Sequence, residues 1–130
     1  MAVTLATAAR NAAANAVVDL LDAGSGQATG SIMFATAAAA LNVCECLLAN
    51  PAFGAASTGV CTAGTIAQGT VAGSGNPSTI AVALFRDRDD AEIFRCAVAA
   101  SGSDINLSSV SVNDDDTIDI SSLTYTQPAS

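Results

Sequence analysis

Four cysteines are the residues of this 130-residue chain that are best suited to chemistry. Cys44 and Cys46 lie two positions apart in a segment that alternates between two faces, as a strand does. On a strand these two side chains point the same way at about 6 to 7 Å, which is too far for a bridge between them. Each cysteine therefore needs a different partner. The candidates for disulfide formation are Cys44, Cys46, Cys61 and Cys96.

The sequence leaves three states open for these thiols. As reduced groups they would act as small apolar core residues, and in an oxidising environment they would form disulfides. A zinc ion would suit the number of thiolates, but a Cys-x-Cys pair on a strand lacks the spacing of structural zinc sites. Zinc is the least favoured of the three, and we expect neither a metal nor another cofactor.

Cys61 is expected to lie differently from the other three cysteines. Cys44, Cys46 and Cys96 stand at alternating positions, which predicts that they face the interior. Cys61 falls in a weak, glycine-bounded strand at 60–63, which is expected near the edge of a sheet. We therefore predict that Cys61, before the others, forms a disulfide with another subunit or with one of the three inward thiols.

Catalysis has few candidate groups in this chain. There is no histidine, which removes the commonest general base and the commonest zinc ligand. Carboxylates that could bind calcium or act as acid and base form two groups, Asp87, Asp89 and Asp90 in one and Asp114, Asp115 and Asp116 in the other. Both groups fall in predicted turns, where aspartate bonds to the backbone, and neither has the spacing of a calcium-binding loop. We expect no catalytic residue, no metal site and no enzymatic activity.

The remaining candidate groups also have structural explanations. Arg86, Arg88 and Arg95 flank the first acidic group and are expected to pair with it. Tyr125, the single tyrosine, is expected to pack at the end of a strand. Neither the arginines nor the tyrosine is therefore expected to form a catalytic site.

One long helix is predicted, and it precedes every strand. Residues 4–22 have helical periodicity, with Thr4 as N-cap and Gly24 in the position of a left-handed C-terminal cap. The side expected to be buried consists of Leu5, Ala8, Ala9, Ala12, Ala16 and Leu20, and the side expected to be exposed carries Asn11, Asn15 and Asp22. Because alanine lets a helix approach closely, we expect this helix to cover a sheet.

A strand-rich body is predicted over residues 31–126. Strands are expected from residue 31 and over 42–48, 60–63, 65–72, 79–86, 91–99, 105–112 and 117–126, with an exposed loop at 73–77. The hairpin formed by 79–86 and 91–99 is the clearest and is expected to be central. About eight short strands at this spacing predict a single mainly-β domain, an antiparallel β-sandwich or jelly-roll-like fold with one N-terminal α-helix.

The composition predicts a protein that associates with itself. Charged residues make up 12% of the chain, 51% is apolar, and the mean hydropathy is +0.47, so part of the surface is expected to be covered in dimers or trimers. The alternative is that the abundant alanine inflates the apolar count. A net charge of -8 repels phosphate and anionic lipid, so we expect neither nucleic acid nor membrane as partner.

No targeting segment is expected. Asn42 and Glu45 interrupt the apolar stretch at 32–48, which argues against a transmembrane span. Arg10, Asn11 and Asn15 would fall within the apolar region of a signal peptide. We therefore expect synthesis in the cytoplasm of the cell that makes the protein.

Four short motifs resemble those of a family of small tailed-phage and prophage proteins. They are NPAFGAA at 50–56, LFRD at 84–87, SGSDINL at 101–107 and LTYTQP at 123–128. Members of that family also start with an alanine-rich helix, and the similarity covers most of the chain. The cysteines depart from the family's pattern, which has small or aliphatic residues at these positions. This departure puts in doubt that the protein is attached to its partners by non-covalent contacts alone.

The resemblance implies a virion structural component without enzymatic activity. It would be a head decoration, cement or capsid-linking protein that binds the major capsid protein of the same phage and stabilises the capsid. An acidic protein suits the outer capsid surface better than the inner wall, which faces packaged DNA. Disulfides formed after release from the reducing host cytoplasm could cross-link it. The alternative is a tail- or fibre-associated receptor-binding module, for which 4% aromatic residues and no tryptophan offer little stacking surface.

Overall fold

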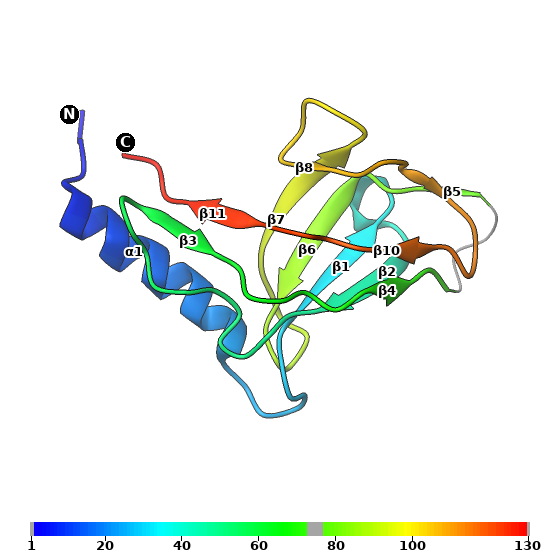
Figure 1. Ribbon diagram of the computed structural model, residues 1–130, viewed down its shortest axis with the longest axis horizontal. Coiled ribbons are helices and arrows are strands. Elements are labelled where there is room, and N and C mark those ends of the chain that lie inside the picture. Colours follow the sequence, from blue (N-terminus) through cyan, green and yellow to red (C-terminus); the bar gives the residue numbers. More distant parts are fainter. Residues whose placement is uncertain (1, 73–76, 130) are drawn as a thin grey trace.

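The computed structural model describes residues 2–72 and 77–129, and it is built mainly from strands (Figure 1). One α-helix, α1, covers Thr7–Asp19 and continues as a 3₁₀ turn, η1, over Leu20–Asp22. The other elements are β1 Ser31–Ala35, the 3₁₀ turn η2 Ala37–Ala39, β2 Asn42–Leu47, β3 Val60–Thr62, β4 Gly69–Thr70, β5 Ser78–Thr79, β6 Val82–Arg86, β7 Glu92–Ala99, β8 Ile105–Asn106, β9 Ser111–Val112, β10 Thr117–Ile118 and β11 Thr124–Thr126. The predicted mainly-β fold with one N-terminal helix is confirmed.

A five-stranded sheet forms the larger layer, with the strand order β2-β1-β6-β7-β8. All its pairs are antiparallel except β7 and β8, which run parallel. The predicted hairpin is observed as β6 and β7, and both strands lie inside the sheet, between β1 and β8. Alternation along the strands places large apolar groups on one face, where Ile32, Phe34 and Phe85 are buried.

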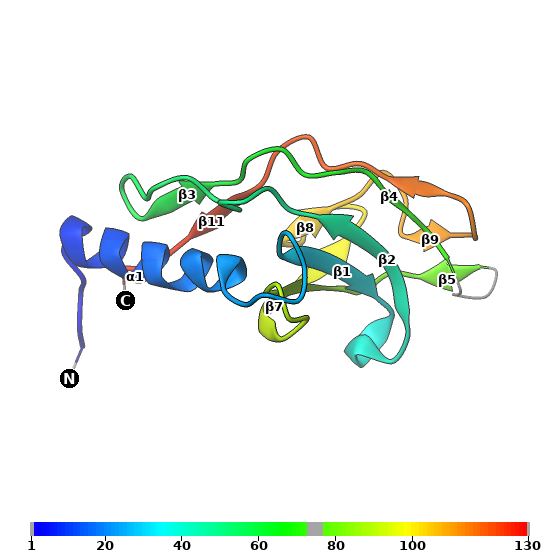
Figure 2. The ribbon, with the colours of Figure 1, turned by 90° about the horizontal axis from the view of Figure 1, so that it is seen from below.

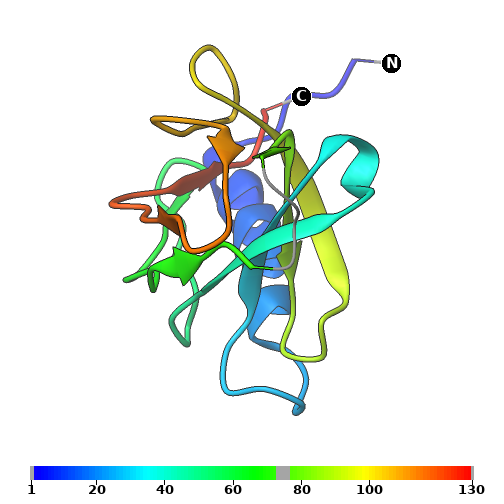
Figure 3. The ribbon, with the colours of Figure 1, turned by 90° about the vertical axis from the view of Figure 1, so that its right-hand side faces the viewer.

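Short ladders form a second layer over that inner face. β3 pairs with β11 and β4 pairs with β10, so that two long segments run side by side along the molecule (Figure 2). The Cys46 thiol donates towards Ile118 O at 3.8 Å, from the first layer to the second. Figure 3, which looks along the long axis, shows the strands curling around a common interior. The two layers agree with the predicted sandwich.

Three predicted strands are wrong in their extent. The segment 105–112 is split into β8 and β9, and the segment 117–126 is split into β10 and β11. The cause is a change of partner within each segment, because β8 pairs with β7 and β9 with β5, whereas β10 and β11 have different partners. The predicted strand 65–72 is reduced to β4, and the loop expected at 73–77 lies, apart from Pro77, outside the described residues.

The second layer is joined to the first along the outer side of β2. The Ala72 amide donates to Val43 O at 3.2 Å, and the Ala67 amide donates to Leu47 O at 2.9 Å. Between these bonds Gly69 approaches β2 so closely that a Cβ atom there would lie 2.4 Å from Glu45 O. The edge of the sheet is thereby covered by backbone rather than by side chains.

The helix is shorter than predicted at both ends. It starts at Thr7 after Ala6, and no side chain caps it, so the expected N-cap role of Thr4 is wrong. The Leu5 amide instead donates to Ala129 O at 2.7 Å, which ties the preceding arm to the C-terminal segment. Gly24 has the expected positive φ, 105°.

The predicted orientation of the helix is also wrong. The side expected to be buried is mostly exposed, including Ala8, Ala12, Ala16 and Leu20, whereas Ala14 and Val18 are buried. The side expected to be exposed faces the protein body. Its polar groups meet backbone amides of the loop before β3, which need acceptors.

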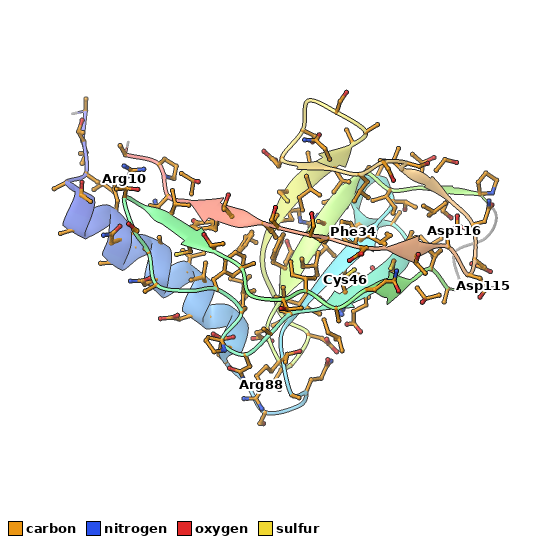
Figure 4. The ribbon with its side chains drawn as sticks, viewed as in Figure 1. Arg10, Phe34, Cys46, Arg88, Asp115 and Asp116 are labelled. Atoms are coloured by element: carbon orange, nitrogen blue, oxygen red, sulfur yellow. The ribbon has the colours of Figure 1, made fainter. Side chains whose placement is uncertain are left out.

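Four polar side chains of α1 and η1 hold the helix to the second layer. The amides of Gly59, Ala56 and Ala52 donate to Asn11 Oδ1 at 2.7 Å, Asn15 Oδ1 at 2.8 Å and Asp22 Oδ1 at 2.9 Å, respectively. Arg10 donates to Gln127 O at 2.9 Å (Figure 4). Because these contacts recur about every turn, they form a polar stripe that replaces the expected alanine contact.

Candidate functional site

The first acidic group is a structural turn between β6 and β7. Asp87 Oδ1 accepts bonds from the amides of Asp89 and Ala91 at 2.8 and 3.0 Å. Asp89 Oδ1 accepts bonds from the amides of Ser25 and Gly26 at 3.1 and 2.7 Å, and these bonds lower the pKa of Asp89. These carboxylates therefore stabilise the turn and bind it to the loop after the helix. The prediction that the first acidic group forms a turn is confirmed.

The expected pairing of the nearby arginines with this group is confirmed only for Arg86. Arg86 pairs with Asp90 at 3.3 Å and with Glu45 across the sheet. Arg95 pairs instead with Glu92 at 2.6 Å on its own strand, and Arg88 donates to Gln27 O at 2.6 Å. With Arg10 bound to Gln127 O, all four cations of the chain bond to groups of the chain itself.

The second acidic group forms the turn between β9 and β10 (Figure 4). Asp116 Oδ2 accepts a bond from the Asn113 amide at 2.8 Å, and Asp115 has a φ of 73°. The Asp115 amide donates to Val71 O at 2.9 Å, which ties the turn to the other strand of the second layer. Among the described residues, no group of histidine, cysteine, aspartate or glutamate is placed to hold a metal ion.

All four cysteines are free thiols in the structure. Cys44 and Cys46 are buried on the inner face of β2, as predicted, and both sulfurs face Gly69. A hydrogen bond from Cys46 lowers the pKa of Cys44, and the same bond, together with burial, raises the pKa of Cys46. Cys96 is half-buried.

Cys61 lies in an edge strand, as expected, because β3 belongs to a two-stranded ladder, but it is not accessible to another subunit. Its side chain is fully buried, because β11 pairs with β3 and α1 packs against β3. Its thiol faces Asn15 Oδ1 at 3.9 Å, and burial raises its pKa. A disulfide from Cys61 to another subunit would therefore require displacement of α1, while the predicted cross-linking of this chain by cysteines stays a prediction.

We expect Cys96 to be alkylated before Cys61 in the native protein. Burial and the nearby Asp104 raise the pKa of Cys96 to about 11, so at pH 8 only about one thiol in a thousand is thiolate. The rate of iodoacetamide labelling at Cys96 should rise about tenfold per pH unit between pH 8 and pH 10. Peptide mapping by mass spectrometry measures both sites, and equal labelling of Cys61 under native conditions would contradict its burial.

A long groove runs along the open side of the molecule. Three hollows of about 450, 360 and 510 Å³ adjoin one another, because each shares lining residues with the next. One wall consists of residues 94–96 and 104–112, and the other wall consists of residues 116–126. We name this feature the seam groove, because no strand pairing joins its two walls anywhere in residues 2–72 and 77–129.

The two ends of the seam groove differ in chemistry. At one end Phe94 stacks on Phe85, with ring centroids 4.4 Å apart, and lies 5.4 Å from the ring of Tyr125. The other end is lined by serines and by the exposed Asp116 and Asp119. The predicted packing of Tyr125 in the final strand is confirmed, and its hydroxyl donates to Gln127 Oε1 at 3.1 Å.

Sequence reasoning did not find the seam groove, although a signal was present. The apolar alternation changes phase at Ser108–Ser109 in the segment 105–112 and at Ser121–Ser122 in the segment 117–126, and only short parts on either side of these points pair. The candidate residues that the sequence singled out, four cysteines and two acidic groups, are not brought together at one site. Of these, Cys96 and Asp116 line the groove, and Arg95 and Tyr125, the other candidates at this place, lie at its aromatic end.

Comparison with models of protein families, with curated proteins and with solved structures finds no match for this chain. No helix in the described part of the chain has the length and apolar character needed to cross a membrane.

Proposed function

We propose that this protein is a non-enzymatic structural component of a tailed-phage particle. It binds the outer face of the major capsid protein lattice as a decoration, cement or linking protein, and it stabilises the capsid. The four motifs described above and the acidic, charge-poor composition support this role. The acidic balance, a net charge of -8, favours the outer surface, away from packaged DNA.

The exposed side of α1 is the observation that carries the proposal. Ala8, Ala12, Ala16 and Leu20 follow one another at intervals of four residues and form an uncharged stripe on solvent. Leu20 is 50% exposed, and Asp19, which precedes it, is an exposed charge beside the stripe. An exposed helix face of a monomer normally carries polar groups, so a small, apolar face suits close contact with another protein.

The same stripe accounts for the proposed self-association. A second copy could pack its own alanine stripe against it, because small side chains let two helices approach closely. In the particle, either the capsid lattice replaces the second copy on this face, or dimers or trimers of the protein bridge neighbouring parts of the lattice. We therefore expect the isolated protein to form dimers or trimers in analytical ultracentrifugation at tens of micromolar.

A co-sedimentation experiment tests the capsid role. Full-length protein is mixed with shells assembled from the major capsid protein of the same phage, and bound protein is measured after centrifugation. Ala12→Arg with Ala16→Arg should reduce binding at least tenfold, because two charges would be desolvated in the contact. Ala100→Arg, an exposed alanine in a turn far from α1 in the sequence, is the matched control. Wild-type protein that stays monomeric and leaves the shells unbound would refute the proposal.

A tail- or fibre-associated receptor-binding module is the second candidate. The half-exposed pair Phe94 and Tyr125 at the end of the seam groove favours it, since aromatic faces can stack on sugars. Binding of a glycan by this pair, lost in Phe94→Ala, together with no binding to capsid shells would favour this function over the first.

A further inference from the structure

We propose that the seam groove binds an extended, basic segment of another protein by strand addition. This inference does not depend on the proposed capsid role. It follows from three features of the groove: free strand edges on both walls, carboxylates along its length, and an aromatic hollow at one end.

Both walls of the groove present unpaired strand edges. Within residues 2–72 and 77–129, β8 pairs with β7 on one side only, and β10 and β11 pair only with β4 and β3, respectively, on the side away from the groove. Residues 119–122 connect the last two strands without belonging to any strand. Such edges offer backbone donors and acceptors to an added strand, and proteins normally cover or charge them.

Three apolar side chains that line the groove are only partly covered. Leu107, Ile120 and Leu123 pack against the core but are half-exposed. Leu107 and Ile120 continue the alternation of Ile105 and Ile118, which are buried. An added strand would cover these side chains and pair with the free edges beside them.

The charges of the groove select a basic partner. Asp104 stands on one wall and Asp116 and Asp119 stand on the other, and all three are exposed. Among the described residues that line the groove, the one cation is Arg95, which lies at the aromatic end and is paired with Glu92. Lysine or arginine side chains of an added strand would lie near unopposed carboxylates and gain electrostatic energy.

The occupant is expected to come from a different protein. This chain has four basic residues, all arginine, and each of them is bound to a group of its own body. A second copy therefore offers no free basic strand. The hollow beside Phe94 and Tyr125 would take an apolar side chain of the foreign segment and fix its register.

The test measures binding of a defined peptide to the full chain. The probe is a fluorescein-labelled, end-blocked peptide of about nine residues in which valine and lysine alternate, matching a typical strand length. We expect micromolar binding by fluorescence anisotropy that weakens as salt is added. Asp104→Asn with Asp119→Asn should weaken binding about tenfold, whereas Asp19→Asn, on the exposed side of α1, should leave it unchanged.

Two further peptides separate strand addition from charge attraction. A peptide with glutamate in place of lysine should not bind. A lysine peptide with alternate backbone amides N-methylated keeps its charge but should lose at least tenfold in affinity, because it cannot donate to the strand edge. Equal binding of the methylated peptide, equal binding to the double aspartate variant, or no binding of the lysine peptide at millimolar concentration would overturn the proposal. If the protein forms dimers and the peptide dissociates them, the groove is occupied by a second copy of the chain, and the proposal of a different protein as the occupant is wrong.

Discussion

Replacing Gly69 by valine is expected to prevent the protein from folding at ordinary temperatures. A Cβ atom at this position would lie 2.4 Å from Glu45 O, 2.6 Å from Cys44 Sγ and 2.9 Å from Cys46 Sγ. One of these neighbours is backbone in the middle of β2, so the clash cannot be relieved by turning a side chain. The second layer would have to move away from the sheet, which would open the core around both cysteines.

The expected cost exceeds about 3 kcal/mol, a large part of the stability of a small domain. Urea denaturation followed by circular dichroism measures it. Gly54→Ala is the matched control, since the nearest atom to its Cβ would be Thr62 O at 3.7 Å, an ordinary contact. If Gly69→Val has the same unfolding midpoint as Gly54→Ala, the close approach of β4 to β2 is wrong.

Replacing Asn11, Asn15 and Asp22 together by alanine is expected to detach α1. Each change leaves a backbone amide of the loop before β3 without its acceptor, at a cost of about 1 to 2 kcal/mol per amide. The sum is about 3 to 6 kcal/mol if the three contributions are additive. This loss occurs although alanine raises intrinsic helix propensity at all three positions.

The measurement is again the free energy of unfolding from urea titration, with hydrogen exchange to localise the effect on α1. The control replaces three alanines of the opposite side, Ala8, Ala12 and Ala16, by lysine. Because these residues are exposed, we expect a change of no more than about 1 kcal/mol. A large loss in the control and a small loss in the first variant would restore the orientation expected from the sequence.

Several parts of the fold were predictable because they depend on local pattern. Strands β1 and β2 and the β6–β7 hairpin follow from alternation and from the aspartate-rich turn between them. The inward positions of Cys44 and Cys46 follow from the same alternation. The absence of histidine and the turn positions of both acidic groups could likewise be read without a structure.

The face of α1 that is buried was decided by tertiary structure alone. Periodicity divides a helix into two faces, but it does not say what each face will meet. Here the partner is a loop whose backbone amides need acceptors. Asn11 and Asn15 therefore stabilise the contact more than Ala12 or Ala16 would. The helix therefore turns its polar stripe inward and leaves alanine on the surface.

The candidate site was also decided by tertiary structure, because strand pairing joins residues far apart in the chain. The residue types in 105–112 and 117–126 favour strands. How much of each segment forms a strand depends on the segments with which it pairs. Each segment pairs on its outer side and leaves its other edge facing the seam groove. A ladder exists only where two segments meet in register, and for that reason sequence pattern predicts strands but not the gap between them.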